Sequence, residues 1–206
     1  MKTTFKIWEL ALLCALVITV LWSALISAQQ AELSDRLIRL HVLAHSDTAA
    51  AQDAKYLVRD RILDEITPLL QGSADRQTAA HVLTDNLAKI TETAAAVLAE
   101  QGLDYPVSVR LTHESSPARV YDTFALPAGS YHALRVEIGA ADGANWWCVV
   151  FPPLCLEAAE ITIDAMETAN FTEDEIALLT EDSPGIAIRF RSLEMIESLR
   201  GWFQRG

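Results

Sequence analysis

The chain has 206 residues, of which 51% are hydrophobic, and it carries a formal net charge of −12. This length suits one folded domain with an appendage, and the apolar fraction is sufficient for a packed core. A chain this acidic is repelled by nucleic-acid phosphates and by anionic lipid, and no cluster of Lys or Arg offsets the charge, so nucleic-acid binding is not expected.

An uncharged apolar run near the N-terminus is the first strong signal. Residues 10–28, LALLCALVITVLWSALISA, contain no charge in 19 positions. As a helix the run spans about 28 Å, close to the hydrocarbon thickness of a bilayer. Lys2 and Lys6 precede it, which favours export of the chain beyond the run. We expect a signal peptide or membrane anchor at residues 1–28 and an exported domain at residues 29–206, with a buried core helix as the alternative.

The next segment predicts a strand and then a helix. Apolar and polar residues alternate over residues 37–42, which is typical of a strand. Ser46 or Asp47 is then expected to cap a helix by accepting an unpaired N–H group. Pro68 is expected to end or kink this helix. The apolar stripe of the helix consists of Ala51, Ala54, Val58, Ile62 and Ile66.

A second helix and a run of strands come next. The helix is predicted between Asp75, its N-cap, and Gly102, its C-cap. The hydrophobic period then changes to two, and short turn sequences separate the strands that result. These predicted strands cover residues 106–111, 119–124, 131–138 and 145–151. Because the links are short, we expect an antiparallel meander.

The remainder of the chain is an acidic variable segment, about residues 156–185, with one short helix at residues 173–179. A brief strand at residues 186–190 and a C-terminal helix at about residues 192–203 come after it. Together these elements predict an α+β domain in which helices pack on one face of a mostly antiparallel sheet. The core of that domain is expected within about residues 37–155.

The histidines do not have the spacing of a metal site. His41 and His45 share one face of the predicted strand but lie about 13 Å apart along it. A joint site forms only if the chain turns back after the strand. The sequence also lacks the motifs of serine nucleophiles and of phosphate-binding loops. We therefore predict no catalytic residue, no metal and no cofactor.

Residues 143–155, GANWWCVVFPPLC, concentrate two tryptophans, two cysteines and a diproline. Cys148 and Cys155 form an even pair in a domain expected to be exported, and a reversal at Pro152-Pro153 would bring them together. A disulfide closing this loop would contribute about 2.5 kcal/mol in the chain-entropy model. Two buried free thiols are the alternative.

Trp146 and Trp147 are adjacent on a predicted strand, so their side chains point to opposite faces. One of them can anchor the core. The other is available to a binding partner unless a helix, such as the C-terminal one, covers its face.

Three segments resemble the stage II sporulation protein R family. Residues 126–155, LPAGSYHALRVEIGAADGANWWCVVFPPLC, resemble the family signature. Upstream, IRLHVLAHSDTAAAQDAKYLVRDRIL resembles a region that in the family reads IR…ANSD…Q…K…VRD, with His45 where the family has Asn. The stretch SPARVYDTFALP is similar to the family's P-x-x-x-Y segment. The likeness covers residues 37–155 well and the acidic segment poorly.

The resemblance implies a signalling protein of endospore formation and not an enzyme. Members of the family are exported from the forespore into the space between forespore and mother-cell membranes. There they activate a membrane-bound aspartic protease, which leads to processing of pro-sigma-E in the mother cell. This chain is therefore expected to be secreted across the forespore membrane or anchored by residues 10–28. Its expected partner is that protease, with no nucleic acid and no small-molecule substrate.

The segments most like the family supply the partner-binding candidates, which are His45, Ser46, Asp47, Asn145, Trp146, Trp147, Pro152 and Pro153. The same residues are alternatively determinants of the fold. Two other functions remain open. One is an exported cell-wall hydrolase with a site formed by His41, His45 and Asp47, and the other is a carbohydrate-binding module that uses Trp146 or Trp147.

Overall fold

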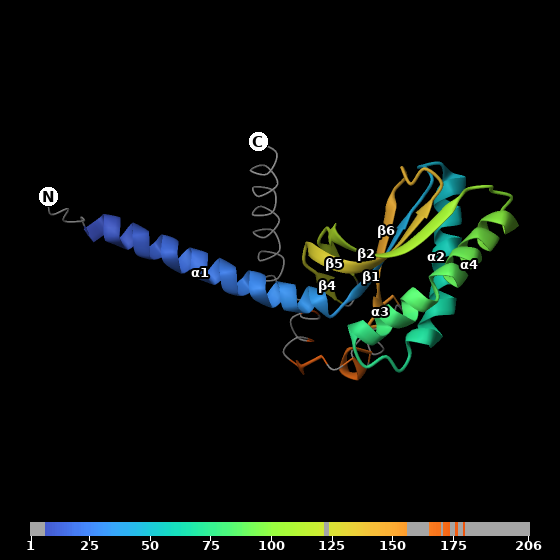
Figure 1. Cartoon of the computed structure of the whole chain (residues 1–206). Helices are drawn as coiled ribbons and strands as arrows, with labels where there is room; N and C mark the ends of the chain where they lie inside the picture. The colour runs from blue at the N-terminus through green and yellow to red at the C-terminus, as the bar shows by residue number, and fades with distance from the viewer. Residues whose placement is uncertain are drawn as a thin grey trace.

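The computed structural model describes residues 7–121, 124–155, 165–169 and 171–173 together with Ile176 and Leu179. A long helix projects from a domain in which three helices cover one face of a sheet (Figure 1). In chain order the elements are α1 (Ile7–Asp35), β1 (Ile38–Leu43), α2 (Ala49–Leu70), α3 (Arg76–Asp85), α4 (Leu87–Glu100), β2 (Val107–Ser116), β3 (Arg119–Val120), β4 (Ala125–Leu126), β5 (Gly129–Ile138) and β6 (Asn145–Phe151).

The four-stranded sheet has the order β2-β5-β1-β6, while β3 and β4 form a separate two-stranded ribbon. The α+β class is confirmed. The sheet is mixed, however, because β1 is parallel to β5 and antiparallel to β6, while β2 is antiparallel to β5. The predicted meander is therefore wrong. The helices that come after β1 cross one face of the sheet and return the chain at its far edge, which leaves β1 in the centre between two later strands.

Helix α2 buries the predicted apolar stripe against the sheet. All five residues of the stripe are at most 2% exposed. The N-cap of α2 is Thr48, whose hydroxyl accepts a hydrogen bond from the N–H of Ala51, and not Ser46 or Asp47. The Asp47 carboxylate instead accepts from the N–H of Ala144 in a distant loop. Pro68 lies within the last turn, and the helix continues only to Leu70.

The predicted second helix is two helices. Asp75 caps α3 as expected and accepts from the N–H of Thr78 at 2.7 Å. The helix stops at Asn86, whose side chain donates to the carbonyl of Val82, so the amide competes with helical backbone bonds. After α4, Gly102 has a φ of +69°, as its predicted C-cap role requires.

The strand predicted at residues 119–124 is shorter in the structure. Only Arg119 and Val120 form β3, because the N–H of Tyr121 donates to the carbonyl of Phe124 at 2.8 Å and closes a turn. The rings of Tyr121 and Phe124 stack with centroids 4.4 Å apart. This turn places Tyr121 against the sheet face that α2–α4 leave uncovered.

Several predicted elements lie largely outside the described residues: the acidic segment at about 156–185, the strand at 186–190 and the helix at about 192–203. Of the short helix predicted at 173–179, the structure describes Glu173, Ile176 and Leu179, and all three are helical.

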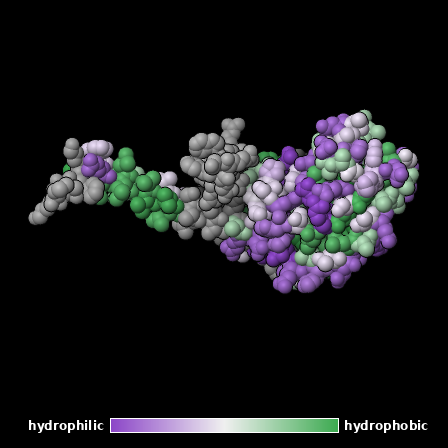
Figure 2. Space-filling view, turned by 45° about the horizontal axis from the view of Figure 1, so that its top comes forward, coloured by the Kyte–Doolittle hydropathy of each residue, from purple (hydrophilic) through white to green (hydrophobic). Residues whose placement is uncertain are grey.

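Among the side chains that the structure describes, those near the C-terminal end of α1 hold the helix to the domain. Leu33 is 4% exposed, and Asp35 forms an ion pair with Arg76 at 3.6 Å and lies 3.4 Å from Nε2 of His132. Over residues 7–22 the helix is mostly apolar and exposed, in contrast to the mostly hydrophilic domain (Figure 2). Within the described residues, no helix combines the length and hydropathy that a membrane span requires.

Candidate functional site

The end of β1 meets the loop between β5 and β6. Because β5 and β6 lie on opposite sides of β1, residues 139–144 must cross the C-terminal end of β1. Two backbone bonds fix this crossing: the N–H of Gly143 donates to Ala44 at 3.0 Å, and that of Asp142 donates to His45 at 3.4 Å. The two segments that supplied most of the partner-binding candidates are therefore neighbours. We call His45, Ser46, Asp47 and residues 139–145 the β1-exit site.

Side chains reinforce the β1-exit site. His45 Nδ1 accepts a hydrogen bond from the N–H of Ala140 at 3.0 Å, and its ring stacks on Tyr105 with centroids 4.1 Å apart. The Asp47 carboxylate accepts from the N–H of Ala144 at 2.6 Å. His45 and Ser46 are half-buried, and the exposed part of the site consists of Asp47, Ala140, Asp142, Ala144 and Asn145.

Two glycines permit this close approach. At Gly139, where φ is +60°, an added Cβ would lie 2.2 Å from His45 Nδ1. At Gly143 an added Cβ would lie 2.3 Å from the carbonyl oxygen of Ser46. The first contact is with a side chain and the second with backbone, so only a shift of the whole loop would admit a side chain at Gly143.

Side chains of helix α2 hydrogen-bond to the backbone of the β1-exit site. Gln52 Nε2 donates to the carbonyl of Ser46 at 2.9 Å, and Lys55 Nζ donates to the carbonyl of Ala144 at 3.2 Å and to Gln52 Oε1 at 2.6 Å. Lys55 is 2% exposed, and this burial lowers the pKa of its ammonium group, with a smaller contribution from the charge of Arg59. The buried Lys55 therefore holds the loop directly at Ala144, and it reaches Ser46 through the side chain of Gln52.

Trp146 and Trp147 point to opposite faces, as predicted. Trp146 lies on the face covered by helices but at its border, where it is half-buried. Its ring forms a T-shaped contact with Tyr56, with centroids 5.5 Å apart, and the Arg59 guanidinium lies 4.3 Å from the centroid of the Trp146 ring. It borders a groove of about 370 Å³ that also contains Leu63 and the two cysteines.

Cys148 and Cys155 form a disulfide with Cα atoms 5.6 Å apart. The chain turns back after β6, where the N–H of Leu154 donates to the carbonyls of Pro152 and Val149. Pro152 is buried in this turn and Pro153 is half-buried, so Pro153 has the more accessible surface of the two.

Trp147 lies on the face opposite α2–α4 and is nevertheless only 7% exposed. Its ring stacks on His41 with centroids 3.6 Å apart, and the Arg39 guanidinium lies 4.9 Å from its centroid. Arg39 is fully buried and donates to the carbonyl of Pro117 and the hydroxyl of Tyr121, each at 3.3 Å. The turn after β3 thus covers this part of the face.

The rest of that face carries an ionic cluster that sequence reasoning missed. We call it the open-face network, and it consists of His41, Arg110, Glu114, Arg135 and Glu137. Glu114 bonds His41 at 2.8 Å and Arg135 at 2.7 Å, and Glu137 bonds Arg110 and Arg135, each at 2.9 Å. The detectable signal was that Arg110 and Glu114 of one strand, and Arg135 and Glu137 of another, occupy positions of the same parity and therefore share one strand face.

Protonation in the open-face network is set by these contacts. Hydrogen bonding from Arg110, with a further bond from Arg135, lowers the pKa of Glu137 to about 2. Burial lowers the pKa of His41, although the hydrogen bond to Glu114 acts in the opposite direction. His41 is therefore neutral at pH 7, while Glu137 is ionised.

The two histidines of the hydrolase alternative have different neighbours. His41 belongs to the open-face network, whereas His45 packs on Tyr105 beside the loop. Over the part of the chain that the structure describes, no three His, Cys, Asp or Glu side chains are grouped as metal ligands.

These features define an α+β domain with a braced, half-exposed surface where two distant segments meet. A family model for stage II sporulation protein R matches residues 34–161. The stage II sporulation protein R of Bacillus subtilis (strain 168) is 34% identical over 155 residues, which cover 70% of this chain and 69% of that protein. The chain belongs to the stage II sporulation protein R family, and this membership supports a sporulation-related role. No solved structure matches the chain.

Proposed function

We propose that this chain is an exported, non-catalytic signal of endospore formation that activates a membrane-bound aspartic protease, so that pro-sigma-E is processed in the mother cell. The β1-exit site is the proposed contact surface. The observation that carries this proposal is that two segments resembling the family meet there, 90 or more positions apart in sequence, in a braced arrangement that leaves polar groups exposed.

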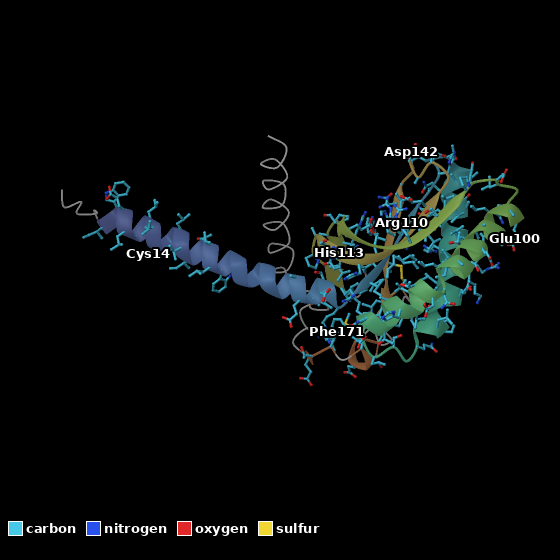
Figure 3. All side chains as sticks on the ribbon, in the orientation of Figure 1. Cys14, Glu100, Arg110, His113, Asp142 and Phe171 are labelled. Atoms are coloured by element: carbon cyan, nitrogen blue, oxygen red, sulfur yellow. A yellow bond between two sulfur atoms is a disulfide. The ribbon has the colours of Figure 1, made fainter. Side chains whose placement is uncertain are left out.

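The position of the β1-exit site fits a signal carried between two membranes. Helix α1 enters the sheet at the start of β1, and the site lies at the other end of that strand. Six residues of strand separate the two by about 20 Å. Asp142, in the loop of the site, lies at the end of the sheet away from α1 (Figure 3). An anchor at α1 would thus direct the site away from the membrane that holds it.

Helix α1 carries the proposed export signal or anchor. The large apolar side chains of residues 7–22 find no cover in the described part of the chain, which favours a nonaqueous environment for them. The exposed large apolar residues are Ile7, Trp8, Leu10, Leu12, Leu13, Leu16, Val17, Ile18, Val20, Leu21 and Trp22. A reporter that functions only outside the cytoplasm, fused after residue 206, should be active. An inactive fusion at normal expression would remove export from the proposal.

The two alternative functions receive less support. A His41–His45 metal site would need both rings to leave their present neighbours. A carbohydrate-binding role needs an accessible aromatic face, but Trp147 is stacked and buried, and Arg59 lies over the ring of Trp146.

Reconstitution with the protease and its pro-sigma substrate tests the contact surface. Asp142 is exposed at the tip of the loop, so Asp142→Lys should preserve the melting temperature and abolish processing of the substrate. Glu92, exposed on α4 away from the site, provides the matched charge-reversal control, and Glu92→Lys should leave processing intact. Full processing of the substrate with Asp142→Lys would mean that the protease binds another surface of this domain.

A further inference from the structure

The two edges of the sheet differ in how their backbone groups are used. On the β6 edge, the carbonyl of Trp147 accepts from the hydroxyl of Tyr121 at 3.3 Å, and that of Val149 accepts from the N–H of Leu154 at 3.2 Å. On the β2 edge no such cover is present among the described residues. Strand β2 is ten residues long, and no proline interrupts it. Long uncovered edges are ready templates for pairing with another strand.

The register identifies which groups face outward from β2. The N–H of Gly139 donates to the carbonyl of Pro106, which extends the β2–β5 ladder by one hydrogen-bonded pair. Hydrogen-bonded pairs alternate along an antiparallel ladder, so every even-numbered residue from Ser108 to Ser116 bonds β5. The odd-numbered residues therefore direct their N–H and C=O groups outward, and they are Val107, Val109, Leu111, His113 and Ser115.

The side chains of β2 are complementary to a second β2 in one register. A two-fold axis at Thr112 places Arg110 opposite Glu114 of the second copy, and Glu114 opposite Arg110, on the open face. The same register pairs Leu111 with His113, both of which have outward-facing backbone groups. An axis at Arg110 or Glu114 would instead oppose like charges. Axes at Leu111 or His113 would leave both charges opposite neutral residues.

The apolar residues of β2 also favour this pairing. Val107, Val109 and Leu111 pack against the core from its border and remain half-buried, whereas Leu134 and Val136 of the adjacent β5 are fully buried. A second strand beside β2 would remove part of the remaining apolar surface from water.

We propose that β2 is a homodimerisation edge, at which two copies of this chain pair antiparallel about a two-fold axis at Thr112. The ladder contains roughly eight intermolecular backbone hydrogen bonds. The proposal does not depend on the proposed signalling function, but the dimer presents two copies of the β1-exit site.

Site-directed cross-linking of the full-length chain in detergent tests this register. The variant is Thr112→Cys in a Cys14→Ser background. In the proposed dimer the Cβ atoms at position 112 of the two chains are about 5 Å apart, so oxidation should link the chains and shift most of the protein to twice the monomer mass. Ser108 lies on the same strand and face, but in the proposed dimer its two copies are about 27 Å apart. Ser108→Cys should therefore cross-link only at background.

A second variant separates the ladder from other contacts, such as association through α1. His113→Pro removes one outward N–H, which an edge strand tolerates, together with the contacts of His113 to Ser130 and His132, and it should abolish the Thr112→Cys cross-link. His113→Ala loses those side-chain contacts but keeps the N–H, so it is the matched control and should retain the cross-link. Equal cross-linking of both cysteine variants, or none from Thr112→Cys, would overturn the proposal. If the cross-link appears only after removal of residues 180–206, that segment and not a second copy occupies the edge.

Discussion

The two faces of the four-stranded sheet are buried by different means. The face under α2–α4 is apolar, and Leu40, Val42, Leu134 and Val136 on it are fully buried. The other face has no helix over it in the described part of the chain, yet Arg39 and His41 are almost completely buried there by aromatic stacking and hydrogen bonds. Burial in this domain is therefore not a consequence of helix cover alone.

The adjacent tryptophans make the contrast plain. Trp147, on the open face, is more buried than Trp146, on the helix-covered face. The tryptophan with surface available to a partner is thus Trp146, and the sequence alone did not decide between the two. Substitutions on each face test this difference.

The largest effect is expected at Trp147. Trp147→Ala should lower the free energy of unfolding by about 3–5 kcal/mol, because the ring supports His41 and Arg39. Trp146→Ala should cost about 1–2 kcal/mol, since part of its ring is already in water. Denaturant titration of both variants measures this. If the two substitutions cost the same free energy, packing at Trp147 on the open face stabilises the domain no more than packing at Trp146 on the border of the other face.

The disulfide lies on the helix-covered side and ranks next. Replacing Cys148 and Cys155 together by Ser should cost about 2.5 kcal/mol, because the unfolded chain gains conformational freedom. Cys14→Ser, at an exposed free cysteine, is the control and should leave stability unchanged. The comparison is made under non-reducing conditions. A double variant as stable as the control would indicate that the loop is ordered without its bridge.

The open-face network should contribute less. Glu137→Gln weakens bonds to Arg110 and Arg135, and we expect a loss of about 1–2 kcal/mol. Glu92→Gln, at an exposed position on α4, should change stability by less than about 0.5 kcal/mol. Denaturant titration at low ionic strength is the measurement. If Glu137→Gln leaves the free energy of unfolding unchanged, the open-face network does not stabilise the fold.

The smallest effect is a pH dependence of the open face. His41 faces Glu114, Arg135, Asn145 and Trp147, and burial holds its pKa below the usual 6.5. Below that pH the unfolded chain takes up a proton that the folded chain does not, so stability is full above about pH 6.5 and declines as the pH falls toward the native pKa.

Thermal melting between pH 7.5 and 5.5 measures the decline, and His41→Asn should flatten it. His132, whose pKa burial also lowers, remains in that variant and sets the residual slope. An unchanged slope in His41→Asn would show that His41 is not the titrating group.

The sequence determined the local structure of this protein to a large extent. The stripe of α2, the cap at Asp75 and the bounds of β6 depend on neighbouring residues, and hydrophobic period and capping chemistry act over a few positions. The approach of Cys148 to Cys155 likewise involves a separation of only seven residues. The family was also recognisable from contiguous motifs.

Only the tertiary structure decided which distant segments meet. The central place of β1 results from the helical crossover, and the crossing of residues 139–144 over its end results in turn from that strand order. The β1-exit site and the open-face network therefore join residues tens of positions apart. Their assembly depends on long-range strand pairing, which a local pattern of residues does not encode, because periodicity specifies which face a side chain occupies but not which strand lies beside it.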